Sequence, residues 1–137
     1  GYLHGLAATE TEGLAFVAAA DTSADRIDAA RADFPDLAGH DSGTSLAANP
    51  DADIPVIATP PSFHAPLPPE LLRAGKHVVM EKPMALTRAD ADEVIATAQA
   101  NDRTVTVHQS RRWDTDFLAV RRLMERGDLG NVFKSRR

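Results

Sequence analysis

Short apolar runs alternate with amphipathic segments along most of this chain. The apolar runs are residues 14–20, 56–58, 77–80 and 104–107. Their length and composition predict strands, of which the first three are apolar enough to be covered on both faces, while 104–107 alternates. Strands joined by helical crossovers pair in parallel, so the pattern predicts an α/β fold.

Two longer helices carry clear start signals. Ser23 can cap a helix that ends at Pro35. Thr87, with Asp90 three positions on, resembles a capping box at the start of another. The side chains expected to face the core are Ile27, Ala30 and Phe34 in the first helix and Ala91, Val94, Ile95 and Ala98 in the second.

Two further helices are expected. Prolines throughout 60–69 exclude the interior of a helix, so the crossover that follows should be short, from near Pro69 to Gly75. The last helix should cover 114–126 and stop at Gly127. Its inward side chains should be Phe117, Val120 and Met124.

Composition narrows the class of protein. A chain of 137 residues with 43% hydrophobic content has the size of one globular domain. A net charge of -5 argues against a large basic surface for nucleic acid, and no apolar run is long enough for a membrane span. The absence of cysteine suits a cytoplasmic protein, and the five histidines lack ligand spacing, so no metal site is expected. A small molecule is the expected partner.

The first residues resemble the second half of a dinucleotide-binding fingerprint. Gly1 opens a helical segment, and Asp21 follows the next predicted strand, where an acidic residue accepts hydrogen bonds from ribose hydroxyls. The first strand of such a fold and its two phosphate-binding glycines are not in the sequence, so we expect residues outside this chain to complete the sheet. The alternative is that Gly1 has no part in a dinucleotide-binding motif and that Asp21 only caps the next helix.

A second group of motifs is more specific. Thr59-Pro60-Pro61 follows one predicted strand, His64 lies shortly after it, and Glu81-Lys82-Pro83 follows the next strand. Together with residues 108–114 and 127–132, these motifs resemble the signature of the glucose-fructose oxidoreductase/inositol dehydrogenase/MocA family. The resemblance covers essentially the whole chain.

The resemblance implies a two-domain NAD(P)-dependent dehydrogenase of sugars, inositols or related polyols. Residues 1–130 would be the Rossmann domain, incomplete at its start, and 131–137 would begin a second domain that forms a homo-oligomer. NAD is expected over NADP because Asp21 should repel a 2′-phosphate, although Arg26 lies close in sequence. The alternatives are a dinucleotide-binding module without catalysis and a truncated, inactive product; we expect this chain alone not to catalyse hydride transfer.

The candidate site residues lie at or just beyond the predicted strand ends, where open parallel sheets bind ligands. Lys82 is the predicted catalytic residue, because oxidation of an alcohol needs a base for the hydroxyl proton or a cation for the developing oxyanion. Pro83 would hold Lys82 in an extended conformation. The resemblance implies cofactor contacts by Gly1, Asp21, Thr59, Pro60, His64, Glu81, Lys82, Pro83 and Arg112.

Several of these residues have a structural alternative. Glu81 could orient Lys82, pair with it in solvent, or lie near the cofactor. His64 could make only local hydrogen bonds. Arg112 could belong to a solvated pair of arginines rather than approach the nicotinamide.

Overall fold

The computed structural model describes residues 1–131, in which strands and helices alternate. The strands are β1 (Ala18–Ala20), β2 (Ala38–His40), β3 (Val56–Ile57), β4 (Val78–Met80) and β5 (Val105–Val107). The α-helices are α1 (Tyr2–Glu10), α2 (Ala24–Asp33), α3 (Gly43–Ala47), α4 (Leu67–Arg73), α5 (Arg88–Ala100) and α6 (Thr115–Glu125), and two 3₁₀ helices are η1 (Pro61–Phe63) and η2 (Ser110–Trp113). The expected start of a second domain lies, except for Asn131, outside the described residues.

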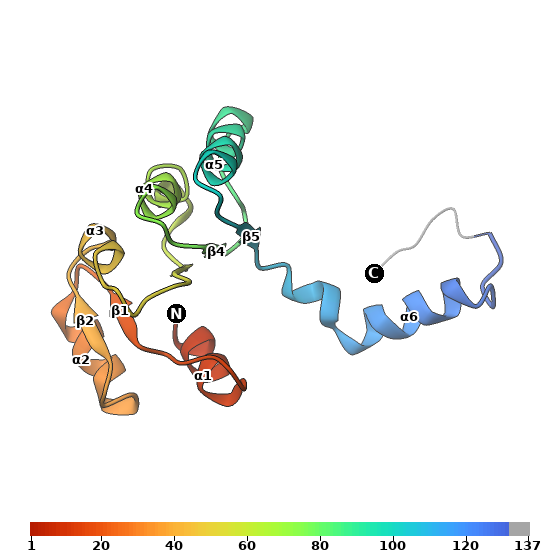
Figure 1. Cartoon of the computed structure of the whole chain (residues 1–137). Helices are drawn as coiled ribbons and strands as arrows, with labels where there is room; N and C mark the ends of the chain where they lie inside the picture. The colour runs from red at the N-terminus through yellow and green to blue at the C-terminus, as the bar shows by residue number, and fades with distance from the viewer. Residues whose placement is uncertain (132–137) are drawn as a thin grey trace.

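All strand pairs are parallel, and they form two sheets, β1–β2 and β3–β4–β5. Helices α3, α4 and α5 lie on one side of the strands, and α1 and α2 lie on the other (Figure 1). The predicted doubly wound α/β class is therefore confirmed. A doubly wound order has one more strand between β1 and β3, and no described residue fills that position.

The main core lies between the β3–β4–β5 sheet and the helices α3, α4 and α5. Its buried side chains are Ala47, Ile57, Leu71, Leu72, Val78, Met80, Val94 and Ala98. Val78 and Met80 of β4 point into this core, whereas Val79, on the opposite face of the strand, is only half-buried. The core thus fixes the three strands whose ends carry the candidate site.

The start signal of α5 is confirmed in detail. The Thr87 hydroxyl accepts a hydrogen bond from the Asp90 backbone N–H at 3.2 Å and donates one to the Asp90 carboxylate at 2.7 Å. Ile95, which we expected to be inward, is instead 41% exposed. The buried stripe runs through Val94, Thr97 and Ala98, so the helix is rotated slightly from the orientation that the apolar spacing predicted.

Strand β2 and helix α3 were not predicted from the sequence. The Ala-Gly-His composition of β2 carries no β-branched or large apolar signal. Gly39 is needed there because a Cβ would lie 2.4 Å from the Ile27 side chain of α2. In addition, α4 begins at Leu67, slightly before the expected start at Pro69.

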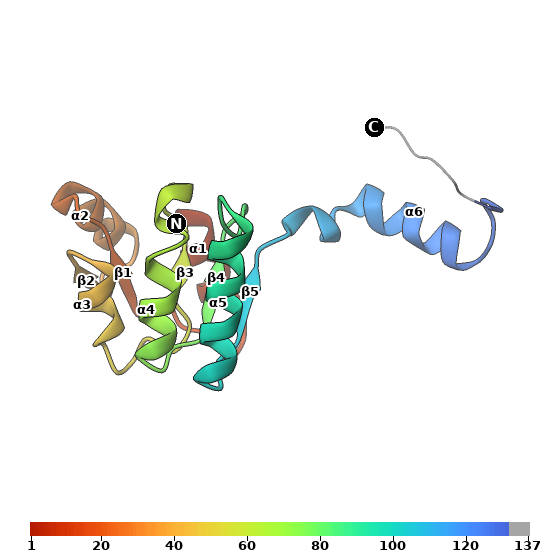
Figure 2. The same ribbon diagram turned by 90° about the horizontal axis from the view of Figure 1, so that it is seen from above.

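The expected burial of α6 is wrong. Phe117, Val120 and Met124 are between 41% and 49% exposed. The segment after β5 runs away from both sheets, so none of the described elements covers the apolar face of α6 (Figures 1 and 2). Amphipathic spacing showed which side of the helix is apolar but could not show whether anything packs against it.

None of the helices within residues 1–131 combines the length and the apolar composition that a membrane crossing requires.

The core assignment predicts a large difference between two leucine-to-alanine variants. Leu72→Ala removes a side chain that is fully buried in the main core, and we expect its free energy of unfolding to fall by about 2–5 kcal/mol. Leu86→Ala, at a position that is 66% exposed, should change the free energy by about 0.5 kcal/mol or less. Urea unfolding of the two purified variants measures both values, and equal losses would contradict this core.

Candidate functional site

The pairing of β3, β4 and β5 brings three loop starts to one edge of the sheet. Met80 pairs with Ile57 in β3 and with Val107 in β5. The backbone hydrogen bonds continue one residue further, since Glu81 N donates to Ile57 O at 2.9 Å and His108 N donates to Met80 O at 2.7 Å. Glu81 and His108 therefore lie side by side at the carboxyl ends of their strands.

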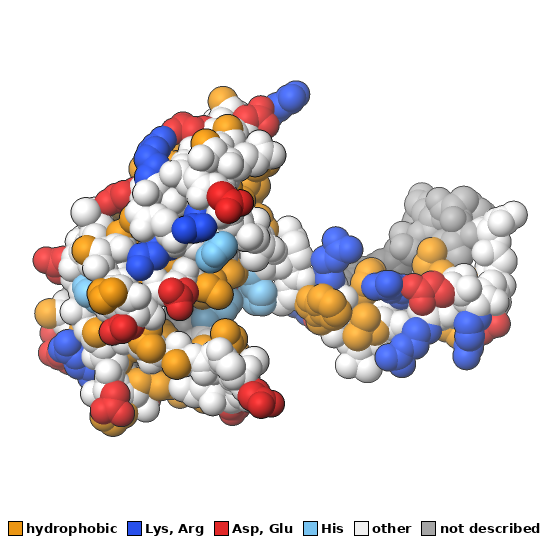
Figure 3. All heavy atoms as spheres, in the orientation of Figure 1, with side chains coloured by type: hydrophobic (Ala, Val, Ile, Leu, Met, Phe, Trp, Pro, Cys, Tyr) orange, Lys and Arg blue, Asp and Glu red, His pale blue; other side chains and the backbone are white. Residues whose placement is uncertain are grey.

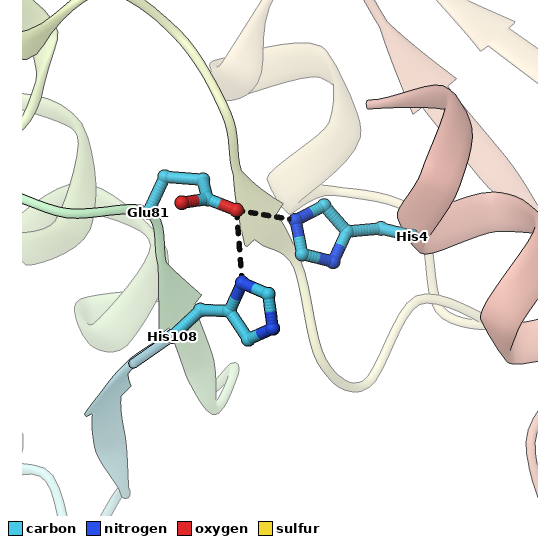
Figure 4. Close-up of side chains that lie close together, drawn as sticks. All are labelled: His4, Glu81 and His108. Carbon is cyan, nitrogen blue, oxygen red and sulfur yellow. Dashed lines mark hydrogen bonds and ion pairs between the residues drawn. The ribbon is translucent and has the colours of Figure 1, made fainter. Parts of the chain in front are cut away.

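The carboxylate of Glu81 lies between two imidazoles (Figure 4). Its Oε1 is 2.8 Å from His4 Nε2 and 2.9 Å from His108 Nδ1, and its Oε2 accepts a hydrogen bond from Lys82 N at 3.3 Å. The two rings meet edge to face, with centroids 4.9 Å apart. Hydrogen bonds from His108 and His4 lower the pKa of Glu81 to about 2, so this carboxylate is ionised at neutral pH.

His4 reaches this edge because of the way α1 packs. It is in the first turn of α1, next to Gly5, the buried residue of that helix. A Cβ at Gly5 would lie 2.7 Å from the Phe16 ring, so glycine permits the close approach of the helix to the segment before β1. His4 was not among the residues predicted from the sequence, and its position three residues after Gly1 was the available signal.

An open pocket of about 440 Å³ lies between the start of α1 and the carboxyl edge of the sheet. Its lining residues are Gly1, Tyr2, Leu3, His4, Ala7, Glu81 and His108. Histidine side chains gather in a hollow on the face of the molecule shown in Figure 3. The pocket thus has the ionised Glu81 and two imidazoles on the sheet side and the N-terminus of α1 on the other, where free backbone N–H groups can bind an anionic group.

Lys82 lies at the same edge and is exposed. Within the described part of the chain, its ammonium makes no hydrogen bond or ion pair, and the Glu81 carboxylate contacts the two histidines rather than this side chain. The peptide bond between Lys82 and Pro83 is cis. The alternative in which Lys82 only pairs with Glu81 in solvent is therefore not observed, and the amine is open to a ligand.

His64 joins the two loops that carry the motifs. Its Nδ1 is 2.6 Å from Pro83 O and its Nε2 is 3.0 Å from Thr59 O. The side chain is only 1% exposed, so both of its nitrogens face backbone carbonyls beneath the surface. His64 therefore holds the backbone of Thr59 in place relative to Pro83. These are the local hydrogen bonds that the sequence offered as the alternative to a cofactor contact.

Asp21 lies directly after β1 at the same end of the strands. Its Oδ1 accepts a hydrogen bond from Ser23 N at 2.9 Å, and its Oδ2 is 3.3 Å from Arg26 Nη1. The pKa of Asp21 is lowered mainly by the hydrogen bond from the Ser23 backbone N–H and, to a smaller extent, by the Arg26 guanidinium. With 29% of its side chain exposed, Asp21 can support the start of α2 and still offer an ionised oxygen to a ligand.

Among the predicted residues, Gly1 lines the pocket without the expected close contact, and Arg112 is not gathered at this edge. Gly1 is the N-cap of α1, but nothing lies within 4 Å of the position a Cβ would take, so the close approach expected of a third fingerprint glycine is not observed. Arg112 is in η2, in the segment that leads away from the sheets toward α6. Its neighbour Arg111 forms an ion pair with Asp114 at 2.9 Å.

Comparison with protein families gives a match over most of the chain. Residues 1–109 match the model of an oxidoreductase family with an NAD-binding Rossmann fold. The chain is 36% identical over 127 residues to the uncharacterized oxidoreductase YdgJ of Escherichia coli, which covers 93% of this chain and 35% of that protein. It is 31% identical over 107 residues to the NADP(+)-dependent scyllo-inositol 2-dehydrogenase IolW of Bacillus subtilis, covering 78% of this chain and 30% of the relative.

The fold has close matches among solved structures. An NAD-binding protein from Listeria innocua superposes with a TM-score of 0.89 and 32% sequence identity, over 96% of this chain and 39% of that one. The chain therefore spans about a third of the length of the relatives that it matches.

The lowered pKa of Glu81 predicts how its contribution to stability depends on pH. Because the folded pKa of about 2 lies below the ordinary value of 4.5, the contribution is fully present above pH 4.5 and is lost as the pH falls toward 2. In metal-free buffer, Glu81→Gln should therefore be less stable than the wild type near neutral pH, and the difference in urea midpoint should shrink below pH 4.5.

The matched control is Glu93→Gln. Glu93 forms an exposed pair with Arg73 at 3.7 Å, and removal of such a pair changes stability little. A wild-type advantage over Glu81→Gln that stayed constant down to pH 2 would show that the histidines do not hold this carboxylate.

Proposed function

Because the chain belongs to the glucose-fructose oxidoreductase/inositol dehydrogenase/MocA family of oxidoreductases, we propose that it forms the nucleotide-binding part of an NAD(P)-dependent dehydrogenase of sugars, inositols or related polyols. The observation that carries the proposal is the open amine of Lys82 beside the anchored Glu81, at the carboxyl edge of a parallel sheet. The proposal covers the whole enzyme, of which this chain corresponds to about a third.

Lys82 is the proposed catalytic residue. When bound, the nicotinamide supplies the acceptor for the hydride of the alcohol carbon. The Lys82 amine would take the hydroxyl proton or, as an ammonium, stabilise the negative charge that develops on the oxygen. An amine without a protein partner is available for either role, whereas an amine in an ion pair would first have to break it.

The neighbours of Lys82 would keep it in position. The two imidazoles hold the Glu81 carboxylate, which also accepts a hydrogen bond from the Lys82 backbone. On the other side, His64 ties the Pro83 carbonyl to the loop after β3. The backbone on both sides of Lys82 is therefore fixed, and such positioning reduces the entropy that must be lost on reaching the transition state.

The cofactor would lie along the same edge. Asp21 would accept hydrogen bonds from the adenosine ribose hydroxyls, the backbone of Thr59 and Pro60 would line the dinucleotide, and the N-terminus of α1 would face its phosphates. We propose NAD as the preferred cofactor, since the ionised Asp21 repels a 2′-phosphate. The assignment of polyol substrates is supported by the relative that is named as a scyllo-inositol dehydrogenase. Location in the cytoplasm and assembly into a homo-oligomer stay predictions.

Substitution of Lys82 tests the catalytic role. With the complete enzyme, a panel of sugars and inositols identifies the substrate of highest turnover. On that substrate we expect Lys82→Ala to lower kcat by about 100-fold or more, with the Kd for NAD nearly unchanged, because the amine acts on the reacting hydroxyl. Lys82→Arg keeps the charge but is a poor base, and separates the electrostatic from the proton-transfer role.

Lys76→Ala is the matched control. Lys76 precedes β4 at the opposite edge of the sheet, where its ammonium donates to Asn49 O at 2.7 Å, so kcat should be retained. Near-normal turnover of Lys82→Ala, or no turnover of the wild type with any sugar or inositol, would overturn the proposal.

Substitution of Asp21 tests the choice of cofactor. The wild type should bind NAD more tightly than NADP, and Asp21→Ser should shift the ratio toward NADP by roughly tenfold, because a hydrogen-bonding charge is lost and Arg26 is released. Asp25→Ser, in the first turn of α2, removes a nearby charge and should leave the ratio unchanged. Fluorescence titration of the three proteins with both dinucleotides gives the three affinity ratios, and tighter NADP binding by the wild type would reject the assignment of NAD.

A further inference from the structure

Three potential metal ligands converge in the pocket from three separate elements. His4 belongs to α1, Glu81 follows β4 and His108 follows β5. One ligand atom from each residue lies within 4.8 Å of the other two, and Glu81 Oε1 contacts both imidazoles (Figure 4). No metal-binding spacing was visible in the sequence, because His4 and His108 are far apart along the chain.

The donor set is one that transition metals use. Two imidazole nitrogens and one carboxylate oxygen are the protein ligands of several catalytic zinc sites, with bonds of about 2.0–2.2 Å. In the structure both imidazoles contact the same carboxylate oxygen, at 2.8 Å and 2.9 Å. An ion inserted between the three atoms would replace these two hydrogen bonds, and small rotations of the side chains would bring the atoms to bonding distance.

The cluster is also accessible. The side chains of His4, Glu81 and His108 are 23%, 30% and 42% exposed, respectively. They line an open pocket, so an ion can enter and its remaining coordination positions can be filled by water or by an oxygen of a bound molecule. A closed structural site would instead surround the ion with protein ligands.

We propose that His4, Glu81 and His108 form a binding site for one divalent transition-metal ion, with Zn²⁺ as the best fit to two imidazoles and a carboxylate. The ion would cross-link α1 to the β3–β4–β5 sheet. The site goes beyond the proposed dehydrogenase activity, because hydride transfer to a nicotinamide requires no metal and the function of Lys82 can be tested separately.

Calorimetric titration of the purified, chelator-treated protein with ZnCl₂ tests this site. We expect one ion per chain, and binding weaker by at least about tenfold in His108→Ala, His4→Ala and Glu81→Gln. His77→Ala is the matched control, because His77 lies before β4 at the opposite edge and accepts a hydrogen bond from Thr104 N. Its affinity for Zn²⁺ should equal that of the wild type.

Two further measurements do not depend on heats of binding. Co²⁺ should give visible d–d absorption bands in the wild type and in His77→Ala but not in His108→Ala. Zn²⁺ should raise the Tm of the wild type and not that of His108→Ala. His108 is exposed and its backbone bond to Met80 does not involve the side chain, so this variant should fold, which circular dichroism checks.

The proposal is overturned if the wild type binds no Zn²⁺ below millimolar concentration. It is overturned equally if binding persists in folded His108→Ala and His4→Ala, or if His77→Ala loses as much affinity as they do. The activity of the enzyme enters none of these measurements, so failure of the metal site and failure of the dehydrogenase proposal are distinguishable.

Discussion

The pairing of Met80 with Ile57 on one side and Val107 on the other determines the geometry of the whole candidate site. In this parallel register the next residue of each strand emerges at the same edge, and the hydrogen bonds of Glu81 and His108 extend the ladder by one step. A shift of one residue would turn Glu81 to the other face of the sheet and separate it from both histidines. The buried core beneath β4 therefore stabilises the site as well as the fold.

At this edge the charged groups have different roles. Glu81 is held by His4 and His108, and its lowered pKa follows from those two contacts. Lys82, the next residue, has its backbone tied to Glu81 and its side chain in solvent. In the proposed reaction, the Lys82 amine can act on the alcohol proton without first leaving an ion pair, and the anchored Glu81 holds the backbone beside it.

Much of this arrangement could be predicted from the sequence. The apolar runs before Thr59 and Glu81 predicted β3 and β4, and the ends of these strands alone predicted that Thr59, Glu81 and Lys82 lie at one edge. The capping-box spacing of Thr87 and Asp90 also predicted the start of α5. These features depend on a few neighbouring residues, and the sequence contains them directly.

Other features depend on contacts between distant residues. Nothing in the sequence near His4 indicates that it contacts Glu81, because the contact requires α1 to approach through Gly5 and Phe16. The burial of His64 likewise depends on two carbonyls from separate loops. For α6 the local pattern was correct, because the helix has an apolar face. The predicted burial of that face was wrong, because none of the other described elements packs against it.

The central claim is that NAD binds along the carboxyl edge of the sheet, next to Lys82. Backbone amide and histidine-ring chemical shifts of the isotopically labelled protein, followed by NMR during titration with NAD, test it most directly. We expect the largest changes at Asp21, Thr59, Glu81 and Lys82 and in the His4 ring, with little change at the opposite edge, where Arg103 donates to Gly75 O. Changes centred on Gly75 and Arg103, or none at Glu81 and Lys82 at saturating NAD, would contradict it.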